Sequence, residues 1–187
     1  FLHHGDTELT THHVLMFPES PIGTAIMNDT DSTAGGYIGS KMWKTTIPLY
    51  TTAIQNSFGV SHVLPHREVI TDSVSSTISS CAGAGACGCS NSWEFVTVLV
   101  NLFNENMISG ERNLSSSYFD VGDCENQISL MKLDSAKTFF RSNDDTNSIW
   151  LRSVMSSSMF CAHSGVYMPR GYMASSKIGI LPYFLLK

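Results

Sequence analysis

The chain contains few charged residues. Asp, Glu, Lys and Arg make up 14% of its 187 residues, against about a quarter in a typical soluble domain, and Ser, Thr, Asn and Gly take up the difference. The formal net charge is -5, and no run of Lys and Arg with interleaved aromatic residues is present. A groove that follows a phosphate backbone is therefore excluded, and we expect no nucleic-acid partner.

The sequence also lacks a long apolar run. The longest candidate, Phe95 to Phe103, falls well short of the roughly 20 residues that a membrane-spanning helix needs. We therefore expect no membrane insertion. No secretion signal is recognisable, and the chain starts at Phe1 without an initiator Met. We expect residue 1 to be a processing product or a cut within a longer chain, with residues 1–187 as its C-terminal domain.

Cysteines are few and irregularly spaced. The five residues form an odd set, which argues against both a disulfide framework and a zinc ribbon. They are Cys81, Cys87, Cys89, Cys124 and Cys161. We expect mostly free thiols. A chain of this length can bury a substantial core without disulfides or metal, so a single domain suffices.

In the first half of the chain, apolar segments alternate with residues typical of turns. "HHVLMF" predicts a buried strand that stops at Pro18, and "NDTDSTAGGY" predicts a turn whose Gly pair adopts positive φ. A helix should then run from Ser40 to Gly59, split into two pieces by Pro48. "SHVLPHREVITDSV" predicts a short apolar segment, a turn and a helix-like turn that carries Glu68.

The second half is less regular. The Gly-Ala tract "CAGAGACGCS" predicts a loop, and "SWEFVTVLVNLF" fits either a central strand or a core helix. Modest helical spacing follows at Ile128, Met131 and Leu133. No internal repeat is present. These patterns predict one α+β domain with a small sheet, short helices and long irregular loops.

Five sequence segments, in this order and at about these separations, resemble those of a known family. They are "STAGGYIGSKMWKTTIP", "HVLPHREVITDSV", "FNENMISG", "SYFDVGDCENQISL" and "WLRSVMSSSMF...GILPYFLL". Together they resemble a phage and gut-bacterial domain of unknown function that ends in a Trp-Leu-Arg box and a Gly-x-x-Pro strand. That domain is similar to the C-type lectin fold, in the branch of formylglycine-generating-enzyme-like proteins and the variable proteins of diversity-generating retroelements.

The resemblance implies an exposed binding face between the Trp-Leu-Arg box and the final strand. We expect residues 154–177 to be largely exposed, without long regular strands or helices, and to contact a partner through side chains typical of recognition surfaces. The expected face comprises Met159, Cys161, His163, Ser164, Tyr167, Met168, Arg170, Tyr172, Met173, Ser175 and Lys177. An ordinary surface loop is the alternative.

A rigid frame should hold this face. Trp150 and Leu151 are large apolar groups suited to anchor a strand, and Arg152, if buried beside them, needs a carboxylate partner. Glu68 is the first choice for that partner, with Asp120 and Asp123 as rivals. The expected frame comprises Trp150, Leu151, Arg152, Glu68, Gly179, Pro182 and Phe184.

Catalytic and metal sites are poorly supported. The start of the chain offers possible zinc ligands at His3, His4, Asp6, Glu8, His12 and His13, but neighbouring residues of a strand point to opposite faces. "NDTDS" lacks the spacing of a calcium loop. The "ACGCS" thiols have no local group that lowers a thiol pKa, and no Gly-x-Ser-x-Gly elbow accompanies "HSG". We therefore expect no cofactor, no metal and no enzymatic activity.

The resemblance leads to one functional hypothesis with two alternatives. The hypothesis is a receptor-binding domain of a phage tail fibre or another virion component. Its partners would be a host cell-surface protein or glycan, other virion proteins and further copies of the chain, for example in a trimer. The alternatives are an oxidase of the formylglycine-generating type and a purely structural virion domain.

Overall fold

The structure is a computed structural model that describes residues 9, 11–74, 92–116, 118–120, 127–133, 148–164 and 168–187. Within the strands, the side chains of Ser164 and Met168 are not described. Several residues singled out in the sequence lie outside the described residues, as does the Gly-Ala tract. They are His3, His4, Asp6, Glu8, Cys81, Cys87, Cys89, Asp123, Cys124 and Tyr167.

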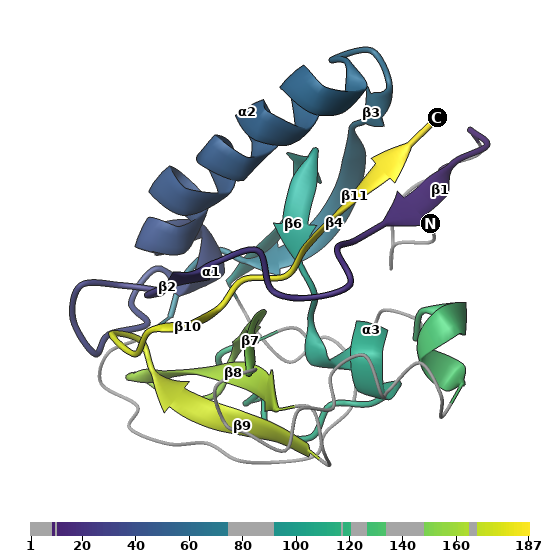
Figure 1. The fold of residues 1–187 in the computed structure, drawn as a ribbon. Coiled ribbons are helices and arrows are strands. Elements are labelled where there is room, and N and C mark those ends of the chain that lie inside the picture. The colour runs from purple at the N-terminus through teal and green to yellow at the C-terminus, as the bar shows by residue number, and fades with distance from the viewer. Residues whose placement is uncertain are drawn as a thin grey trace.

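Strands outnumber helices, and the predicted α+β class is confirmed (Figure 1). The strands are β1 (Val14–Met16), β2 (Thr24–Ala25), β3 (Val63–Leu64), β4 (His66–Thr71), β5 (Trp93–Val98), β6 (Val100–Leu102), β7 (Ile149–Val154), β8 (Met159–Ser164), β9 (Met168–Met173), β10 (Ile178–Gly179) and β11 (Pro182–Leu186). The helical elements are α1 (Gly36–Gly39), the π-helix η1 (Met42–Thr46), α2 (Ile47–Phe58), α3 (Glu105–Ser109) and the 3₁₀ helix η2 (Ser129–Lys132).

The described strands form two sheets and a ribbon. In the four-stranded sheet, β11 pairs antiparallel with β1 along one edge and with β3 and β6 along the other. The five-stranded sheet has the order β2-β10-β7-β8-β9, with β10 and β7 parallel. β4 and β5 form a separate antiparallel ribbon. Because β1 pairs with β11, the first and last of the described strands lie side by side (Figure 1).

The helical region follows the sequence signals in part. Pro48 lies in the first turn of α2, but η1 runs into α2 without a break, since the Ile47 N–H donates to the Met42 carbonyl oxygen. Pro48 therefore does not split the helix into two separate pieces as predicted. Gly59 ends α2 with φ 92°, and the Gly pair Gly35 and Gly36 adopts positive φ as predicted. β1 also ends before Pro18, but it is not the buried strand that was predicted, because Val14 is 61% exposed. These signals depend on local backbone chemistry, which is readable without knowledge of the fold.

In the described part of the chain, the core consists of two hydrophobic clusters that meet at β7. Trp150 and Val154 lie in the larger cluster, whereas Ile149 and Leu151 lie in the smaller one. All six residues of β7 are buried, so alternate side chains enter cores on opposite faces of the sheet. A strand buried on both sides in this way fixes the two halves of the molecule to each other.

Other expectations about the fold are wrong. Glu68 lies in strand β4, not in a helix-like turn, and five of the six residues of β4 are buried, which hides the alternation that marks a strand. Residues 154–177 were expected to be largely exposed and to lack long regular strands. They contain two six-residue strands, β8 and β9, and among their described residues only Arg170, Met173, Ser175 and Lys177 are exposed. β8 pairs with β7 and β9 pairs with β8, and this pairing holds both segments extended although their residues do not favour strands on their own.

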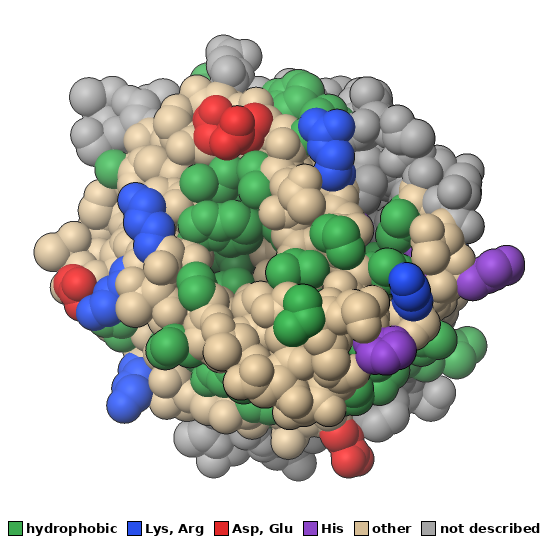
Figure 2. Space-filling model, turned by 90° about the horizontal axis from the view of Figure 1, so that it is seen from above, with side chains coloured by type: hydrophobic (Ala, Val, Ile, Leu, Met, Phe, Trp, Pro, Cys, Tyr) green, Lys and Arg blue, Asp and Glu red, His purple; other side chains and the backbone are tan. Residues whose placement is uncertain are grey.

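The surface is mixed. On the face drawn in Figure 2, hydrophobic side chains gather around a hollow, with charged side chains around it. Within the part of the chain that the structure describes, no helix is both long and apolar enough to cross a bilayer.

Candidate binding face and its frame

Trp150 anchors the frame. Its side chain is fully buried, and the indole Nε1 donates a hydrogen bond to the carbonyl oxygen of Ala25 at 2.8 Å. The ring also packs edge-on against Tyr172, with 6.3 Å between the centroids. Trp150 therefore links β2, β7 and β9, which are far apart in the sequence.

A buried carboxylate lies between the ribbon and the two sheets. Glu68 has no exposed surface, and its Oε2 lies 3.0 Å from Arg152 Nη2. Asn101 Nδ2 donates to the same oxygen at 2.8 Å. His66 Nε2 lies 2.9 Å from Oε1, to which the Tyr183 hydroxyl also donates. The predicted pairing of Glu68 with Arg152 is confirmed.

Neighbouring groups keep the Glu68 carboxyl ionised. Burial alone would raise the pKa of this carboxyl, but the Arg152 guanidinium and the hydrogen bonds from His66 and Tyr183 outweigh burial and lower the pKa to about 2. Both oxygens are occupied and neither is accessible, so Glu68 is suited to join elements and not to exchange protons with a substrate.

Asp120, the rival partner, has another role. Its Oδ1 accepts a hydrogen bond from the Thr71 hydroxyl at 2.8 Å, and its Oδ2 accepts one from the backbone N–H of Val154 at 3.3 Å. Arg152 instead donates through Nη1 to the carbonyl oxygen of Val69 at 2.9 Å. Asp120 thus fastens the end of β7 to the end of β4.

The last two strands complete the frame. Gly179 pairs with Ile149, and a Cβ at Gly179 would lie 2.7 Å from the carbonyl oxygen of Ser148, so only glycine fits there. Pro182 and Phe184 are buried in β11, and the Phe184 ring lies 5.3 Å from that of Phe58 on α2. The structure brings every residue of the expected frame into the core or against it.

The expected binding residues divide between the two faces of the β8–β9 hairpin. Opposite residues are Met159 and Met173, Phe160 and Tyr172, Cys161 and Gly171, and Ala162 and Arg170. Because side chains alternate, Arg170 and Tyr172 share one face, whereas Met159, Cys161, His163 and Met173 share the other. The hairpin does not gather all of them on one surface, and no local pattern in the sequence indicates this register.

Burial excludes one expected contact residue. Cys161 is fully buried in the smaller core cluster, opposite Gly171, so its inclusion in the binding face is wrong. Burial and the nearby carboxylates of Glu105 and Asp120 raise the pKa of its thiol well above the ordinary value. Cys161 is therefore a core residue and an unreactive thiol. It is the one cysteine among the described residues.

Tyr172 and Arg170 occupy the first face. Tyr172 is half-buried against Trp150, and its hydroxyl lies 3.3 Å from Ser148 Oγ. Arg170 is exposed on the edge strand. On this face, Tyr172 thus packs against the frame, whereas Arg170 is exposed to solvent.

Methionines dominate the second face. Met159 is half-buried and Met173 is 46% exposed. A Cβ at Gly171 would lie 2.3 Å from Met155 Sδ and 3.5 Å from Met159 Sδ, so the glycine leaves room for both thioethers. Met155 is not among the residues predicted for the binding face, and no spacing rule would have placed it over Gly171.

Ser175 and Lys177 follow β9 in an exposed turn. The Ser175 hydroxyl and backbone N–H both donate to Asp31 Oδ1, at 2.5 and 3.1 Å, and these bonds lower the pKa of Asp31. Asp31 belongs to "NDTDS", so this turn borders the face, which the sequence did not reveal. Among the described residues, no cluster of three His, Cys, Asp or Glu side chains could hold a metal.

Comparison of the chain with protein families, curated proteins and solved structures gives no match.

Proposed function

We propose that this chain is a receptor-binding domain of a phage tail fibre or another virion component, with a C-type-lectin-like fold. It recognises a host-surface protein or glycan through the β8–β9 hairpin and the turn after it. The resemblance of the five sequence segments to a phage and gut-bacterial domain supports a role in a virion. The antiparallel β7–β8–β9 arrangement, with β10 parallel to β7 in the same sheet, supports the fold.

The observation that carries the proposal is the division between buried and exposed groups within one short segment. β7 is buried along its whole length, whereas Arg170, Met173, Ser175 and Lys177 are exposed on strands and turns attached to it. A rigid support lowers the conformational entropy that the contact side chains lose on binding. Substitutions at the exposed positions leave the buried contacts of β7 in place.

Cell binding tests the proposal. The labelled chain, added to a panel of gut bacterial isolates, should bind a subset of strains in flow cytometry. The double variant Arg170→Ala/Lys177→Ala should bind those strains about tenfold more weakly if these side chains are hot spots. Lys187→Ala is the matched control, because Lys187 is an exposed cation outside the hairpin. Equal loss in the control variant, or no bound strain, would contradict the proposal.

A further inference from the structure

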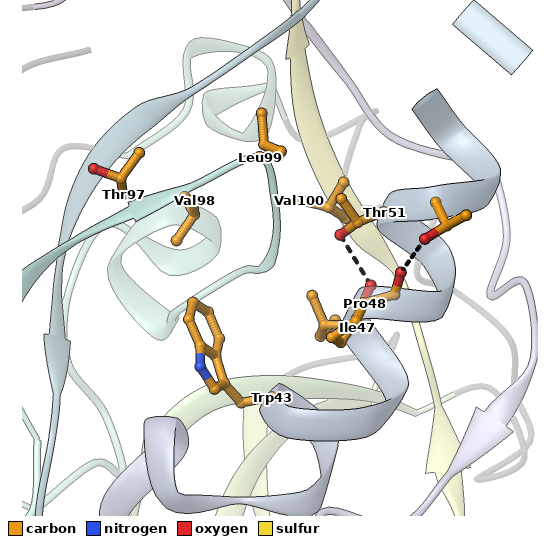
Figure 3. A pocket seen from close by; sticks show the side chains of 9 residues that line it. Trp43, Ile47, Pro48, Thr51, Thr97, Val98, Leu99 and Val100 are labelled. Atoms are coloured by element: carbon orange, nitrogen blue, oxygen red, sulfur yellow. Dashed lines mark hydrogen bonds between the residues drawn. The ribbon is translucent and has the colours of Figure 1, made fainter. Parts of the chain in front are cut away.

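A pocket lies between the start of α2 and the junction of β5 and β6 (Figure 3). Its lining is apolar apart from Thr hydroxyls, and none of the lining side chains is charged. The hydroxyls of Thr51 and Thr52 already donate to the carbonyl oxygens of Ile47 and Pro48, at 3.0 Å each. The lining therefore does not identify a ligand, in contrast to a group of sulfur atoms beside the β8–β9 hairpin.

Methionines are concentrated near this hairpin. Four of the nine methionines of the chain fall between residues 155 and 173. Three of the four have described side chains, namely Met155, Met159 and Met173. Met155 and Met159 are half-buried, and Met173 is 46% exposed. Small solutes can therefore reach this group of thioethers from solvent.

The three side chains lie on one face of the sheet. Met159 and Met173 are directly opposite each other in the β8–β9 pairing, and Cβ atoms of such a pair are about 4.5–5.5 Å apart. Gly171 precedes Met173 by two positions, so a Cβ at Gly171 would point to the same face as Met173. The Sδ atoms of Met155 and Met159 lie 2.3 and 3.5 Å from that Cβ position. The two sulfurs therefore converge over the glycine, beside Met173.

Backbone hydrogen bonds fix the positions from which these side chains start. The Met155 N–H donates to the carbonyl oxygen of Met159 at 3.0 Å, across the turn of residues 156–158 between β7 and β8. The Ala174 N–H donates to the carbonyl oxygen of Ser158 at 2.9 Å, which joins the end of β9 to the same turn. Because the backbone is held before a ligand arrives, less conformational entropy is lost when the side chains bind one.

The chemistry of this face favours a soft cation. Cys161 lies opposite Gly171 on the same face, and the carboxylates of Glu105 and Asp120 are close enough to raise the pKa of its thiol. Arg170, the cation of β9, is on the other face of the hairpin. Thioether sulfur is an uncharged, soft ligand that selects Cu(I), whereas hard cations such as Ca²⁺ and Mg²⁺ prefer oxygen.

We propose that the Sδ atoms of Met155, Met159 and Met173 bind Cu(I) as a three-thioether site. The expectation that the chain holds no metal is based on His, Cys, Asp and Glu side chains, and it does not consider methionine. This site goes beyond the proposed receptor contact and does not depend on it.

Titration with Ag⁺, a redox-inert probe for Cu(I) sites, tests the proposal in nuclear magnetic resonance spectra. The sample is the full chain with isotope-labelled methionine methyl groups, in chloride-free buffer, with four cysteines changed to Ser because thiolates compete for soft metals. The changed residues are Cys81, Cys87, Cys89 and Cys124. One equivalent of Ag⁺ should shift and saturate the methyl signals of Met155, Met159 and Met173. Cu(I), kept reduced without oxygen, should displace Ag⁺, whereas Zn²⁺, which prefers thiolate, imidazole and carboxylate, should not.

Variants of the same sample assign the ligands. Met173→Leu, a change of similar volume at an exposed position, should stay folded and weaken Ag⁺ about tenfold or more. Met16→Leu is the matched control, because Met16 is a half-buried methionine of β1, outside the hairpin. Cys161→Ala should keep the three methyl shifts, because the thiol is not one of the ligands.

Three results would overturn the proposal. They are the absence of a saturable shift at one equivalent, the same Ag⁺ affinity in Met173→Leu as in the Met16→Leu control, and loss of the site in folded Cys161→Ala. The experiment uses no bacterial cells, so its failure is separate from failure of the proposed receptor contact.

Discussion

Glu68 is the residue on which most elements of the frame converge. Its carboxylate contacts side chains from β4, β6, β7 and β11. Removing one partner of a buried ion pair typically costs about 3–5 kcal/mol, because the remaining charge stays buried without compensation. The network therefore makes the frame dependent on charge as well as on apolar packing.

This dependence predicts a specific response to acid. The pKa of Glu68 falls from an ordinary value of 4.5 to about 2 on folding, so the stabilisation is fully present above pH 4.5 and is lost as the pH drops toward 2. The corresponding loss is about 3 kcal/mol. Chemical denaturation at several pH values between 5 and 2 should show it.

Glu68→Gln supplies the comparison for the acid response. This variant should be about 3–5 kcal/mol less stable at pH 7, since Arg152 then lacks its carboxylate. It should also lack the Glu68 component of the acid response. The same pH dependence in both proteins would contradict the assignment of that component to Glu68.

At the scale of elements, the β8–β9 hairpin depends on a glycine. Gly171→Ala places a Cβ against Met155 Sδ, which must move away, and overpacking of this kind costs about 1–3 kcal/mol. If the thioether is the obstacle, the double variant Gly171→Ala/Met155→Ala should be more stable than the sum of the two single effects predicts. Equilibrium unfolding of the four proteins measures this coupling. Strict additivity would show that Met155 is not the obstacle.

Elements with local signals could be predicted from the sequence, and elements defined by long-range pairing could not. Pro18, Pro48 and Gly59 mark boundaries through their own backbone chemistry. β4 was missed because burial on both faces removed its alternation. β8 and β9 were missed because Met, His, Cys and Pro do not favour strands on their own, whereas antiparallel pairing of β8 with β7 and of β9 with β8 holds them extended.

The candidate site was predictable to a similar extent. A large aromatic residue such as Trp150 and an Arg that needs a carboxylate are both read from residue chemistry, and the structure buries both. The side of the hairpin on which Arg170 or Met173 lies depends on strand register. A shift of one residue reverses every side chain, and nothing local in the sequence fixes that register.

At the scale of the whole molecule, the residues that stabilise the fold are distinct from the exposed residues of the proposed contact surface. β7 joins two core clusters, and the four-stranded sheet closes on β11 at the end of the chain. The β8–β9 hairpin joins this support through β7, and Phe160, Cys161 and Ala162 of β8 lie in the core clusters, whereas Arg170 and Met173 of β9 are exposed. Substitutions at the exposed positions should therefore leave the fold intact.

The most direct test of this separation is a paired measurement of stability and cell binding. Trp150→Ala should lower the free energy of unfolding by about 3–5 kcal/mol, because a fully buried indole and its hydrogen bond are lost. Arg170→Ala should stay within about 0.5 kcal/mol of the parent chain, because the side chain is exposed, while weakening cell binding about tenfold if it is a hot spot. If Arg170→Ala unfolds the domain and Trp150→Ala does not, the support and the contact surface have been assigned the wrong way round.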